Sequence, residues 1–307
     1  MPHRFIAGVD IGASNVRVAI ANEDGEIEAR RSTPFTGGTP EEVLQRISRT
    51  IDELARGVWV GAQAAATGVA LPGTVDPTKG TVASAANLPG WGEVPIAEIL
   101  SGPRHIAVAM DNDANAAAVG EQWLGAARGL TDFVFIALGT GIGSGVVLDG
   151  KLHRGAHFLA GEVAFMPMTR EHLRDPGWDS CLEGIVGGRV YATKANELLG
   201  DHARAADLFE AAKSGDPRAA EWLRKLQEYL AMSVADIIAL LDPQAVIFGG
   251  GVTMAQGETF VAPIRDMALR SVPFGAKILV STLGEDAQLL GAIKLAIDRL
   301  DSESGAK

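Results

Sequence analysis

The hydrophobic residues of this chain fall into short runs that end at glycine-rich turns, and the arrangement occurs twice. Each copy has an apolar run, a glycine turn, a second apolar run and an Asp-Gly turn, first over residues 5–25 and again over 133–150. Asp24-Gly25 and Asp149-Gly150 are dipeptides that favour hairpin turns. A supersecondary pattern repeated after about 125 residues predicts a duplicated architecture.

The periodicity predicts strands and helices in a similar order in both halves. We expect strands at 5–11, 15–22, 26–33, 64–71, 105–110, 132–138, 143–149, 160–168, 244–248 and 277–281. We expect helices from Pro40 to about Ala55, with Thr39 as the N-cap, and near 95–101, 181–199, 203–213, 217–241 and 287–300.

Three strands in a meander, followed by alternating helices and strands, predict an α/β domain. Because the pattern occurs twice, we expect two such domains around a cleft. The first should span residues 1–111 and be completed by the C-terminal helix at 290–307, and the larger second domain should span 112–289.

The composition narrows the class of protein. The chain has 307 residues, 47% of them hydrophobic, and a net charge of −11, with Lys and Arg scattered along it, which argues against a nucleic-acid partner. Cys181 is the one cysteine, so no internal disulfide forms. We find neither an apolar run of membrane-spanning length nor a signal peptide before the first strand, and we expect a cytoplasmic protein with no membrane partner.

The glycine turns predict sites for an anion. Glycine lets the backbone approach a ligand closely, and successive backbone amides form a concave anion site, for which phosphate is the natural guest. Thr140 and Ser144 add hydroxyls to the second turn, and Asp10 adds a carboxylate beside the first. Since Mg²⁺ prefers carboxylates together with phosphate oxygens, this combination suits a nucleotide–magnesium complex.

Two other phosphate motifs do not fit. Residues 145–152 nearly match a P-loop, but Leu152 stands where a Ser or Thr must hold magnesium, and the segment has the pattern of a hairpin. The dinucleotide-binding fingerprint of a strand, G-x-G-x-x-G and a helix is absent near the start of the chain.

The segment Asp111-Asn112-Asp113 follows a strand and opens an alanine-rich helix. Asn112 or Asp113 could cap the helix, which is a structural role. The functional alternative is a general base at the carboxyl end of a strand, where ligands of open α/β sheets bind. Phosphoryl transfer needs positioning, charge neutralisation and one carboxylate that accepts the hydroxyl proton.

Other candidate residues have equally plain structural explanations. Glu162 follows Gly161, and Glu183 lies at the start of a helix, so each could be a solvated or first-turn glutamate. Asn87 precedes Leu-Pro and could be a turn residue. The run Gly249–Gly251 could be a simple strand-to-helix turn or a place where the backbone approaches an adenine or ribose.

Together these motifs resemble the ROK family of bacterial sugar kinases, which have the duplicated actin-like (ribonuclease H-like) ATPase fold. The resemblance covers nearly the whole chain and keeps the family's motif order. The matching segments are Asp10-Ile-Gly-Ala-Ser and Gly139-Thr-Gly-Ile-Gly for phosphate, Asn87-Leu-Pro-Gly-Trp, Gly161-Glu162 and Cys181-Leu-Glu183 for sugar, Asn112-Asp113-Ala-Asn for catalysis, and Leu241-Asp-Pro-Gln through Gly251 for adenosine.

The resemblance implies an ATP- and magnesium-dependent kinase that phosphorylates the 6-hydroxyl of a hexose, with glucose first among the candidates, and it implies a homodimer. Asp113 would be the catalytic base. The sugar would be bound by Gly73, Asn87, Asn112, Asp113, Glu162 and Glu183. The nucleotide would be bound by Asp10, Gly12, Ala13, Ser14, Gly139, Thr140, Gly141, Gly249, Gly250 and Gly251, with Asp10 holding Mg²⁺ through water.

The chain departs from the family pattern at its zinc site. ROK kinases usually carry Cys-x-Cys-Gly-x-x-Gly-Cys and a histidine three residues after the Gly-Glu glutamate. Here Cys181 is the last thiol of that set and Phe165 replaces the histidine, which also touches the sugar in the family. A structural zinc needs four N or S ligands, so we expect no zinc and instead apolar packing around Phe165, Met166 and Trp178. The first phosphate motif also ends in Ser14-Asn15 in place of the usual Thr-Lys.

Three alternatives remain beside a glucokinase. The sugar could be allose, fructose, mannose, N-acetylmannosamine or N-acetylglucosamine, all of which the family handles. The protein could be a catalytically silent sugar-binding member. A sugar-sensing repressor would carry a helix-turn-helix module before this fold, and here the first phosphate strand begins at Phe5.

Overall fold

A computed structural model describes residues 4–58, 63–85, 88–102 and 105–305 of the chain. The chain divides into two compact units. The N-terminal unit comprises Met1–Arg128, Arg154–Leu159 and Asp286–Lys307, and the C-terminal unit comprises Gly129–His153 and Ala160–Glu285. The N-terminal unit is therefore completed by the last helix of the described chain.

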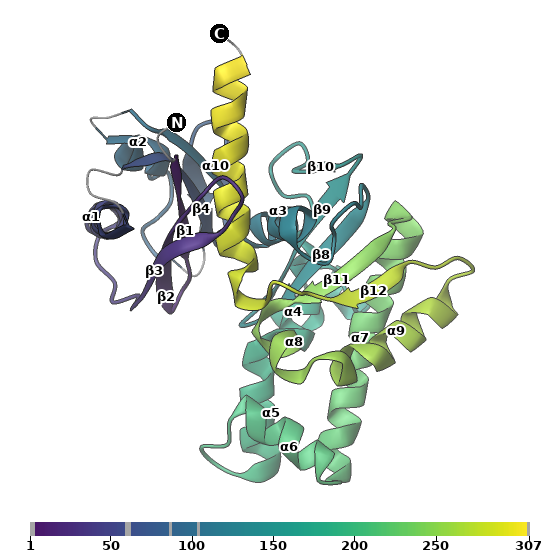
Figure 1. Cartoon of the computed structure of the whole chain (residues 1–307). Helices are drawn as coiled ribbons and strands as arrows, with labels where there is room; N and C mark the ends of the chain where they lie inside the picture. The colour runs from purple at the N-terminus through teal and green to yellow at the C-terminus, as the bar shows by residue number, and fades with distance from the viewer. Residues whose placement is uncertain (1–3, 59–62, 86–87, 103–104, 306–307) are drawn as a thin grey trace. The chain divides into compact units, whose positions relative to one another are not determined.

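The N-terminal unit contains a five-stranded sheet in the order β3-β2-β1-β4-β7 (Figure 1). The first three strands form an antiparallel meander, and β4 and β7 run parallel to β1. The strands are β1 (Phe5–Ile11), β2 (Asn15–Ala21), β3 (Ile27–Pro34), β4 (Ala64–Leu71) and β7 (Ala107–Asn112), with a separate hairpin of β5 (Thr74–Asp76) and β6 (Thr81–Ser84). The helices are α1 (Pro40–Val58), α2 (Ile96–Ser101), α3 (Asp113–Leu124) and α10 (Ala287–Gly305).

The C-terminal unit contains a second five-stranded sheet in the order β10-β9-β8-β11-β12. Its strands are β8 (Phe133–Leu138), β9 (Ile142–Leu148), β10 (Lys151–Leu152), β11 (Ala245–Gly249) and β12 (Lys277–Val280). Its α-helices are α4 (Leu182–Val186), α5 (Gly188–Leu199), α6 (Ala205–Lys213), α7 (Pro217–Leu241), α8 (Gly250–Gln256) and α9 (Glu258–Ser271). Within the described ranges, no helix has the length and apolar content needed to span a bilayer.

The two sheets share one topology, which confirms the predicted duplication. In each, a three-stranded antiparallel meander is followed by two parallel strands. The expected strand at 160–168 is wrong, because the third strand of the second meander is β10, directly after the Asp149-Gly150 turn. Both turn residues have positive φ, 51° and 73°, as a two-residue hairpin requires. Residues 160–168 instead form a loop with a one-turn 3₁₀ helix, Val163–Phe165.

The helix expected at 181–199 is interrupted at Gly187, where the backbone is extended. The interruption has a clear cause in packing. The N–H of Gly188 donates to the carbonyl of Gly139 at 2.9 Å, and a Cβ on Gly188 would lie 2.1 Å from that oxygen. Ending α4 and starting α5 here lets the backbone of α5 contact the turn between β8 and β9.

Helix α1 begins as the sequence predicts. The N–H of Glu42 donates to Thr39 Oγ1 at 3.3 Å, and the N–H of Thr39 donates to the Glu42 carboxylate at 3.0 Å. This reciprocal pair is a capping box, which satisfies two backbone donors that the helix leaves free. The buried side of α1 packs with β1 and β2 in one hydrophobic core.

Helix α10 covers the other face of the N-terminal sheet, beside β1, β4 and α3 (Figure 1). The contact is between backbones. A Cβ on Gly68 of β4 would lie 1.7 Å from the carbonyl oxygen of Ala292, and a Cβ on Gly291 would lie 1.7 Å from that of Ala116 in α3. Glycine is therefore required where α10 crosses the sheet and α3.

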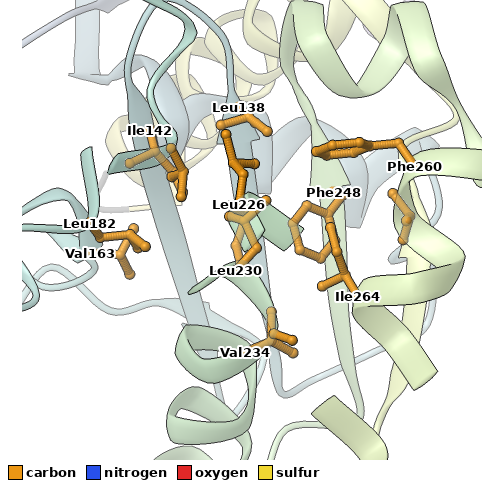
Figure 2. Close-up of a cluster of buried hydrophobic side chains, with 14 of the residues drawn as sticks. Leu138, Ile142, Val163, Leu182, Leu226, Leu230, Val234, Phe248, Phe260 and Ile264 are labelled. Carbon is orange, nitrogen blue, oxygen red and sulfur yellow. The ribbon is translucent and has the colours of Figure 1, made fainter. Parts of the chain in front are cut away.

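The core of the C-terminal unit lies between its sheet and helices α7 and α9 (Figure 2). Leu226, Leu230 and Val234 follow each other at four-residue spacing along α7, so they form one apolar face. They pack with Phe248 of β11, and the cluster extends to Phe260 and Ile264 of α9 and to Leu138 and Ile142 at the β8–β9 turn. The strand ends that carry the glycine turns thus rest on a packed core.

We expect Gly68→Ala to destabilise the protein by about 1–3 kcal/mol or more, because the added methyl group overlaps the backbone of α10. The control is Gly57→Ala in α1, where nothing lies within 4 Å of the added Cβ. That change should be neutral or stabilise by up to about 1 kcal/mol. Urea unfolding of both variants measures the difference, and equal stability would contradict the packing described for α10.

Candidate functional site

The carboxyl ends of three parallel strands lie in register at one edge of the N-terminal sheet. Asp10 of β1 is opposite Ala70 of β4, and Ala70 is opposite Asp111 of β7. Asn112 directly follows Asp111, and Gly73 lies three residues after Ala70 and accepts from the Asn112 side chain, so residues predicted from separate parts of the sequence come together. This edge is where open α/β sheets bind their ligands.

Asn112 and Asp113 form the junction between β7 and α3. The side chain of Asn112 caps the helix by accepting from Ala114 N–H at 2.9 Å, so the structural role considered above is real. The same side chain donates from Nδ2 to the carbonyl of Gly73 at 3.0 Å. Asp113 is the first residue of α3 and is half-buried, with Oδ1 accepting from Ala114 N–H at 2.8 Å. Its carboxylate therefore lies at a helix N-terminus, which favours negative charge.

Gly73 must be a glycine. Its φ is +102°, and a Cβ there would lie 2.1 Å from the carbonyl oxygen of Ser84. The residue turns the chain from β4 into the β5–β6 hairpin and directs its carbonyl to Asn112. Asn87, predicted to lie near it, falls outside the described residues.

Asp111 and Arg154 were not predicted as part of the site. Asp111 is 2% exposed, and its Oδ2 accepts from Arg154 Nε at 2.7 Å. Its Oδ1 accepts from the N–H of Asn112 at 2.9 Å and from Asn115 Nδ2 at 2.8 Å. A buried charge is retained when it is paired and hydrogen-bonded, so this carboxylate fixes the backbone just before Asp113. A carboxylate at the end of a buried strand is the sequence signal, but nothing in the sequence pairs it with Arg154.

Asp10 forms an ion pair with its cross-strand neighbour Arg17. Nε and Nη2 of Arg17 both lie 2.8 Å from Oδ2 of Asp10. Burial raises the pKa of Asp10, and the adjacent guanidinium opposes that shift. The carboxylate proposed for magnesium thus already has a protein cation beside it, which the sequence analysis did not foresee.

The turn between β1 and β2 carries the first phosphate motif. It is closed by a bond from Gly12 N–H to the carbonyl of Asn15 at 2.8 Å, and it leaves Ala13 and Ser14 exposed. The carbonyl of Ser14 accepts from Phe35 N–H at 2.8 Å, which joins the turn to the segment after β3.

The second phosphate motif lies at the carboxyl ends of β8 and β11, which are adjacent because Ala137 pairs with Gly249. Gly139 N–H donates to the carbonyl of Gly141 at 2.9 Å and closes the turn around the exposed Thr140.

The glycines of these two strand ends differ in the space beside them. Gly250 has φ +85°, and a Cβ there would lie 2.5 Å from the carbonyl oxygen of Leu138, so it is required for packing. A Cβ on Gly139 would approach nothing closer than the backbone nitrogen of Gly251 at 4.0 Å, and a Cβ on Gly251 would meet nothing within 4 Å. Bare backbone with open space beside it is suited to a phosphate.

Glu183 is held against the same turn. Its Oε2 accepts from Ile142 N–H at 2.9 Å, and a Cβ on Gly141 would lie 2.2 Å from that oxygen. Gly141 is thus a glycine to make room for Glu183.

Glu162 lies close enough to Glu183 for their charges to interact. Burial raises the pKa of Glu162, and the negative charge of Glu183 raises it further. The loop before Glu162 is fixed by a bond from Ser144 Oγ to the carbonyl of Gly161 at 2.7 Å. Glu162 and Glu183 therefore influence each other's charge within the C-terminal unit.

The expected apolar packing at the altered zinc loop is only partly right. Phe165 and Trp178 meet edge to face with ring centroids 5.9 Å apart, but they are 59% and 51% exposed, so these two rings contribute little burial, whereas Met166 packs against the core of the unit. The loop is held by main-chain bonds from Met168 N–H to Ser180 and from Leu182 N–H to Met166, at 3.0 and 2.9 Å.

The cysteine and the histidine of this loop both have protein partners. Cys181 is buried and its thiol donates to the carbonyl of Trp178, while His172 Nδ1 is 2.7 Å from Ser180 Oγ. In the part of the chain that the structure describes, no three His, Cys, Asp or Glu side chains are grouped to hold a metal ion.

The fold is the duplicated actin-like ATPase fold of ROK sugar kinases, as solved relatives show. Residues 6–299 match the ROK family, and the chain belongs to that family. This confirms the resemblance inferred from the motifs.

Relatives with a known activity align over almost the whole chain. A glucokinase of Thermotoga maritima is 32% identical over 98% of this chain and 99% of its own length. An N-acetylmannosamine kinase of Shigella flexneri is also 32% identical, over 95% and 98%. The crystal structure of a ROK family glucokinase from Streptomyces griseus, in complex with glucose and AMPPNP, superimposes with a TM-score of 0.79 at 31% identity, over 96% of this chain and 99% of that one.

We expect Glu183→Gln to lower the pKa of Glu162, because it removes the neighbouring negative charge that disfavours ionisation. When the pKa of a carboxyl group is higher in the folded than in the unfolded protein, the free energy of unfolding falls as the pH rises from the unfolded to the folded pKa. The unfolded pKa of Glu162 is near 4.5, so above pH 4.5 the free energy of unfolding should fall less in Glu183→Gln than in the wild type. Carboxyl ¹³C NMR titration measures the pKa. Glu171→Gln, an exposed glutamate of the same loop region, is the control. An unchanged Glu162 pKa in Glu183→Gln would rule out the coupling.

Proposed function

We propose that this protein transfers the terminal phosphoryl group of ATP to the 6-hydroxyl of a hexose, with glucose as the first candidate. The observation that carries the proposal is the Asn112–Asp113 junction at the head of α3 in a chain that aligns along its whole length with glucokinases. Phosphoryl transfer asks little covalent chemistry of the protein, so a positioned base and a phosphate cradle are sufficient.

Asp113 is the proposed base and accepts the proton of the sugar hydroxyl as the oxygen attacks phosphorus. Its half-buried position at a helix N-terminus supports this, because a helix N-terminus attracts negative charge. We propose that the sugar hydroxyls are bound by Gly73, Asn87, Asn112, Glu162 and Glu183. The bond from Asn112 to Gly73 supports a common role for these two residues.

The nucleotide is proposed to bind the glycine turns: Gly12, Ala13 and Ser14 in one unit, and Gly139, Thr140, Gly141, Gly249, Gly250 and Gly251 in the other. The open space at Gly139 and Gly251 fits this role, since a side chain at either position would fill it. Gly141 and Gly250 are required for packing, and they support the cradle by letting neighbouring groups approach it.

Magnesium is proposed to be held by Asp10 through water. Both bonds from Arg17 to Asp10 go to Oδ2 of that carboxylate. Among the described residues no donor to Asp10 Oδ1 is seen, which is consistent with a water-mediated contact at Oδ1. Bound with ATP, the ion neutralises phosphate charge. Arg17 keeps Asp10 in place and offsets part of its charge, which fits a water-mediated contact better than a direct one.

The sugar is the least determined part of the proposal. An N-acetylmannosamine kinase has the same 32% identity to this chain as a glucokinase, over a somewhat shorter alignment, so that sugar is the second candidate. Phe165 stands where the family has a sugar-contacting histidine, and it lies one helical turn after Glu162 with more than half of its surface exposed. A coupled assay of ADP release across hexoses and N-acetylhexosamines distinguishes the candidates by kcat/KM.

We also propose that the protein is a cytoplasmic homodimer. The buried free thiol of Cys181 is consistent with a reducing compartment. Met232 and Leu240 of α7 are 52% and 82% exposed and lie eight residues apart, hence near the same face of that helix, which supports a partner surface. Sedimentation of wild type and of a Met232→Lys, Leu240→Lys variant tests the dimer.

Asp113→Asn should reduce kcat by about 10²–10⁴-fold or more, because the change keeps the shape and removes the proton acceptor. Sugar binding by calorimetry should change little. Asp201→Asn, in the exposed turn after α5, is the matched control and should keep full activity. If Asp113→Asn had near-wild-type turnover, Asp113 would have only a structural role at the start of α3 and the proposed base would be refuted.

Gly139→Ala and Gly141→Ala should raise the KM for different substrates, ATP in the first variant and the sugar in the second. Both glycines lie in the proposed phosphate turn, but a Cβ on Gly141 would lie 2.2 Å from the Glu183 carboxylate, whereas a Cβ on Gly139 has open space. We expect Gly139→Ala to keep its melting temperature and raise KM for ATP, since only a phosphate competes for that space. Gly141→Ala should raise KM for the sugar by displacing the Glu183 carboxylate. Equal effects on both KM values in both variants would contradict this division.

The purified protein should contain no stoichiometric zinc, and EDTA should stop activity without unfolding it, with magnesium alone restoring turnover. The reason is that Phe165 cannot coordinate a metal and Cys181 is engaged with a carbonyl. Elemental analysis and thermal unfolding with EDTA check this. About one zinc per chain would overturn the expectation and direct attention to His157, His172 and Cys181.

A further inference from the structure

The N-terminal unit contains a cavity of about 460 Å³ on the side of its sheet that faces α1. Its size falls within the range of about 300–1,000 Å³ that is typical of small-molecule sites. The cavity is lined by Val16, Val18, Arg31, Thr33, Pro34, Thr36, Val43, Arg46, Ile47, Arg49, Thr50 and Glu53. We call it the β3–α1 groove.

The register of the strands and the period of the helix explain why these residues share the groove. Val16 pairs with Thr33 and Val18 pairs with Arg31, so all four point to the same face of the sheet. On α1, Arg46 and Thr50 follow Val43 at three- and four-residue spacing and lie on one side of the helix. The floor is apolar and buried, and the rim is formed by arginine and threonine.

The charge of the groove is opposite to that of the chain. Three arginines and one glutamate line it, whereas the whole protein has a net charge of −11. Arg31 is paired with Glu53 at 2.6 Å. Arg46 donates one bond to the Gly37 carbonyl at 3.0 Å, and Arg49 donates one to the Gln45 carbonyl at 3.3 Å.

Arg46 and Arg49 each use one donor in these bonds, so most N–H groups of their guanidiniums are available to a ligand. Each guanidinium has five N–H groups. Neither Arg46 nor Arg49 has a carboxylate partner within the described residues. Two unneutralised guanidiniums beside a cavity favour an anion, and their planar forks suit phosphate oxygens.

The β3–α1 groove is separate from the candidate site. Side chains alternate across a strand, so Arg17, which pairs with Asp10, points to the face opposite Val16 and Val18. The strand β2 therefore contributes to the ion pair of the candidate site on one face and to the groove on the other.

We propose that the β3–α1 groove is a second ligand site, which binds a small phosphate monoester. Arg46 and Arg49 hold the phosphate, and a short carbon skeleton covers Val16, Val18 and Ile47. The threonines at the rim are neutral hydrogen-bonding partners for hydroxyls of such a ligand. This inference does not depend on the proposed kinase activity, because it concerns binding to the other face of the sheet.

Isothermal titration of the full chain with glycerol 3-phosphate tests the proposal. We expect saturable one-site binding by the wild type. Arg46→Gln with Arg49→Gln should weaken it by about tenfold or more, since hydrogen bonds between charged groups contribute more than one decade of affinity. The control removes two arginines of the same unit that lie outside the groove, Arg30→Gln with Arg56→Gln, and should bind as the wild type does.

A second variant separates a pocket from a merely basic surface. Thr33→Phe keeps every arginine and places a ring in the groove from an edge strand that tolerates aromatic residues. It should abolish binding as well. The proposal is overturned by absence of saturable binding in the wild type, by equal weakening in the two double variants, or by unchanged binding in Thr33→Phe. Basal ADP release, which should be unchanged in all groove variants, reports separately on the proposed function.

Discussion

The close approach of α10 to the N-terminal sheet is the constraint on which the first half of the site depends. Backbone meets backbone where Gly68 faces Ala292 and where Gly291 faces Ala116. Because α3 is held by that contact, the Asn112–Asp113 junction at its head is positioned by a helix nearly 180 residues further along the chain. Because backbones are in contact there, a shift of α10 would have to move α3 and the junction with it.

The two units have the same sheet topology but carry different residues at the ends of corresponding strands. In the N-terminal unit the strand ends carry carboxylates, and each is restrained by a cation, Arg17 for Asp10 and Arg154 for Asp111. In the C-terminal unit β8 ends at Leu138 and β11 at Gly249, and the glycine turn after β8 is contacted by Glu183, which accepts from Ile142 N–H. A duplicated fold thus keeps a glycine turn after the first strand in both copies and adds buried strand-end carboxylates in the first copy alone.

Local patterns in the sequence were sufficient to predict most helices and strands. The predictions were wrong where a contact between residues far apart in the sequence determines the structure. Thr39 and Glu42 predict the start of α1 because a capping box involves residues three apart. The interruption at Gly187 was missed because its cause, the carbonyl of Gly139, lies far away in the sequence. The same holds for the site. Asp113 and the glycine turns could be found from motifs, whereas the ion pair of Asp111 with Arg154 and the fit of Glu183 against Gly141 depend on tertiary contacts.

The placement of α10 also orders events during synthesis. The C-terminal unit is nearly contiguous, and all of its residues emerge from the ribosome before α10 does. The N-terminal sheet, although translated first, has one face without its covering helix until residues 287–305 appear. Domains usually fold in the order in which they are made. The first unit departs from that order, because one face of its sheet has no covering helix until α10 has been made.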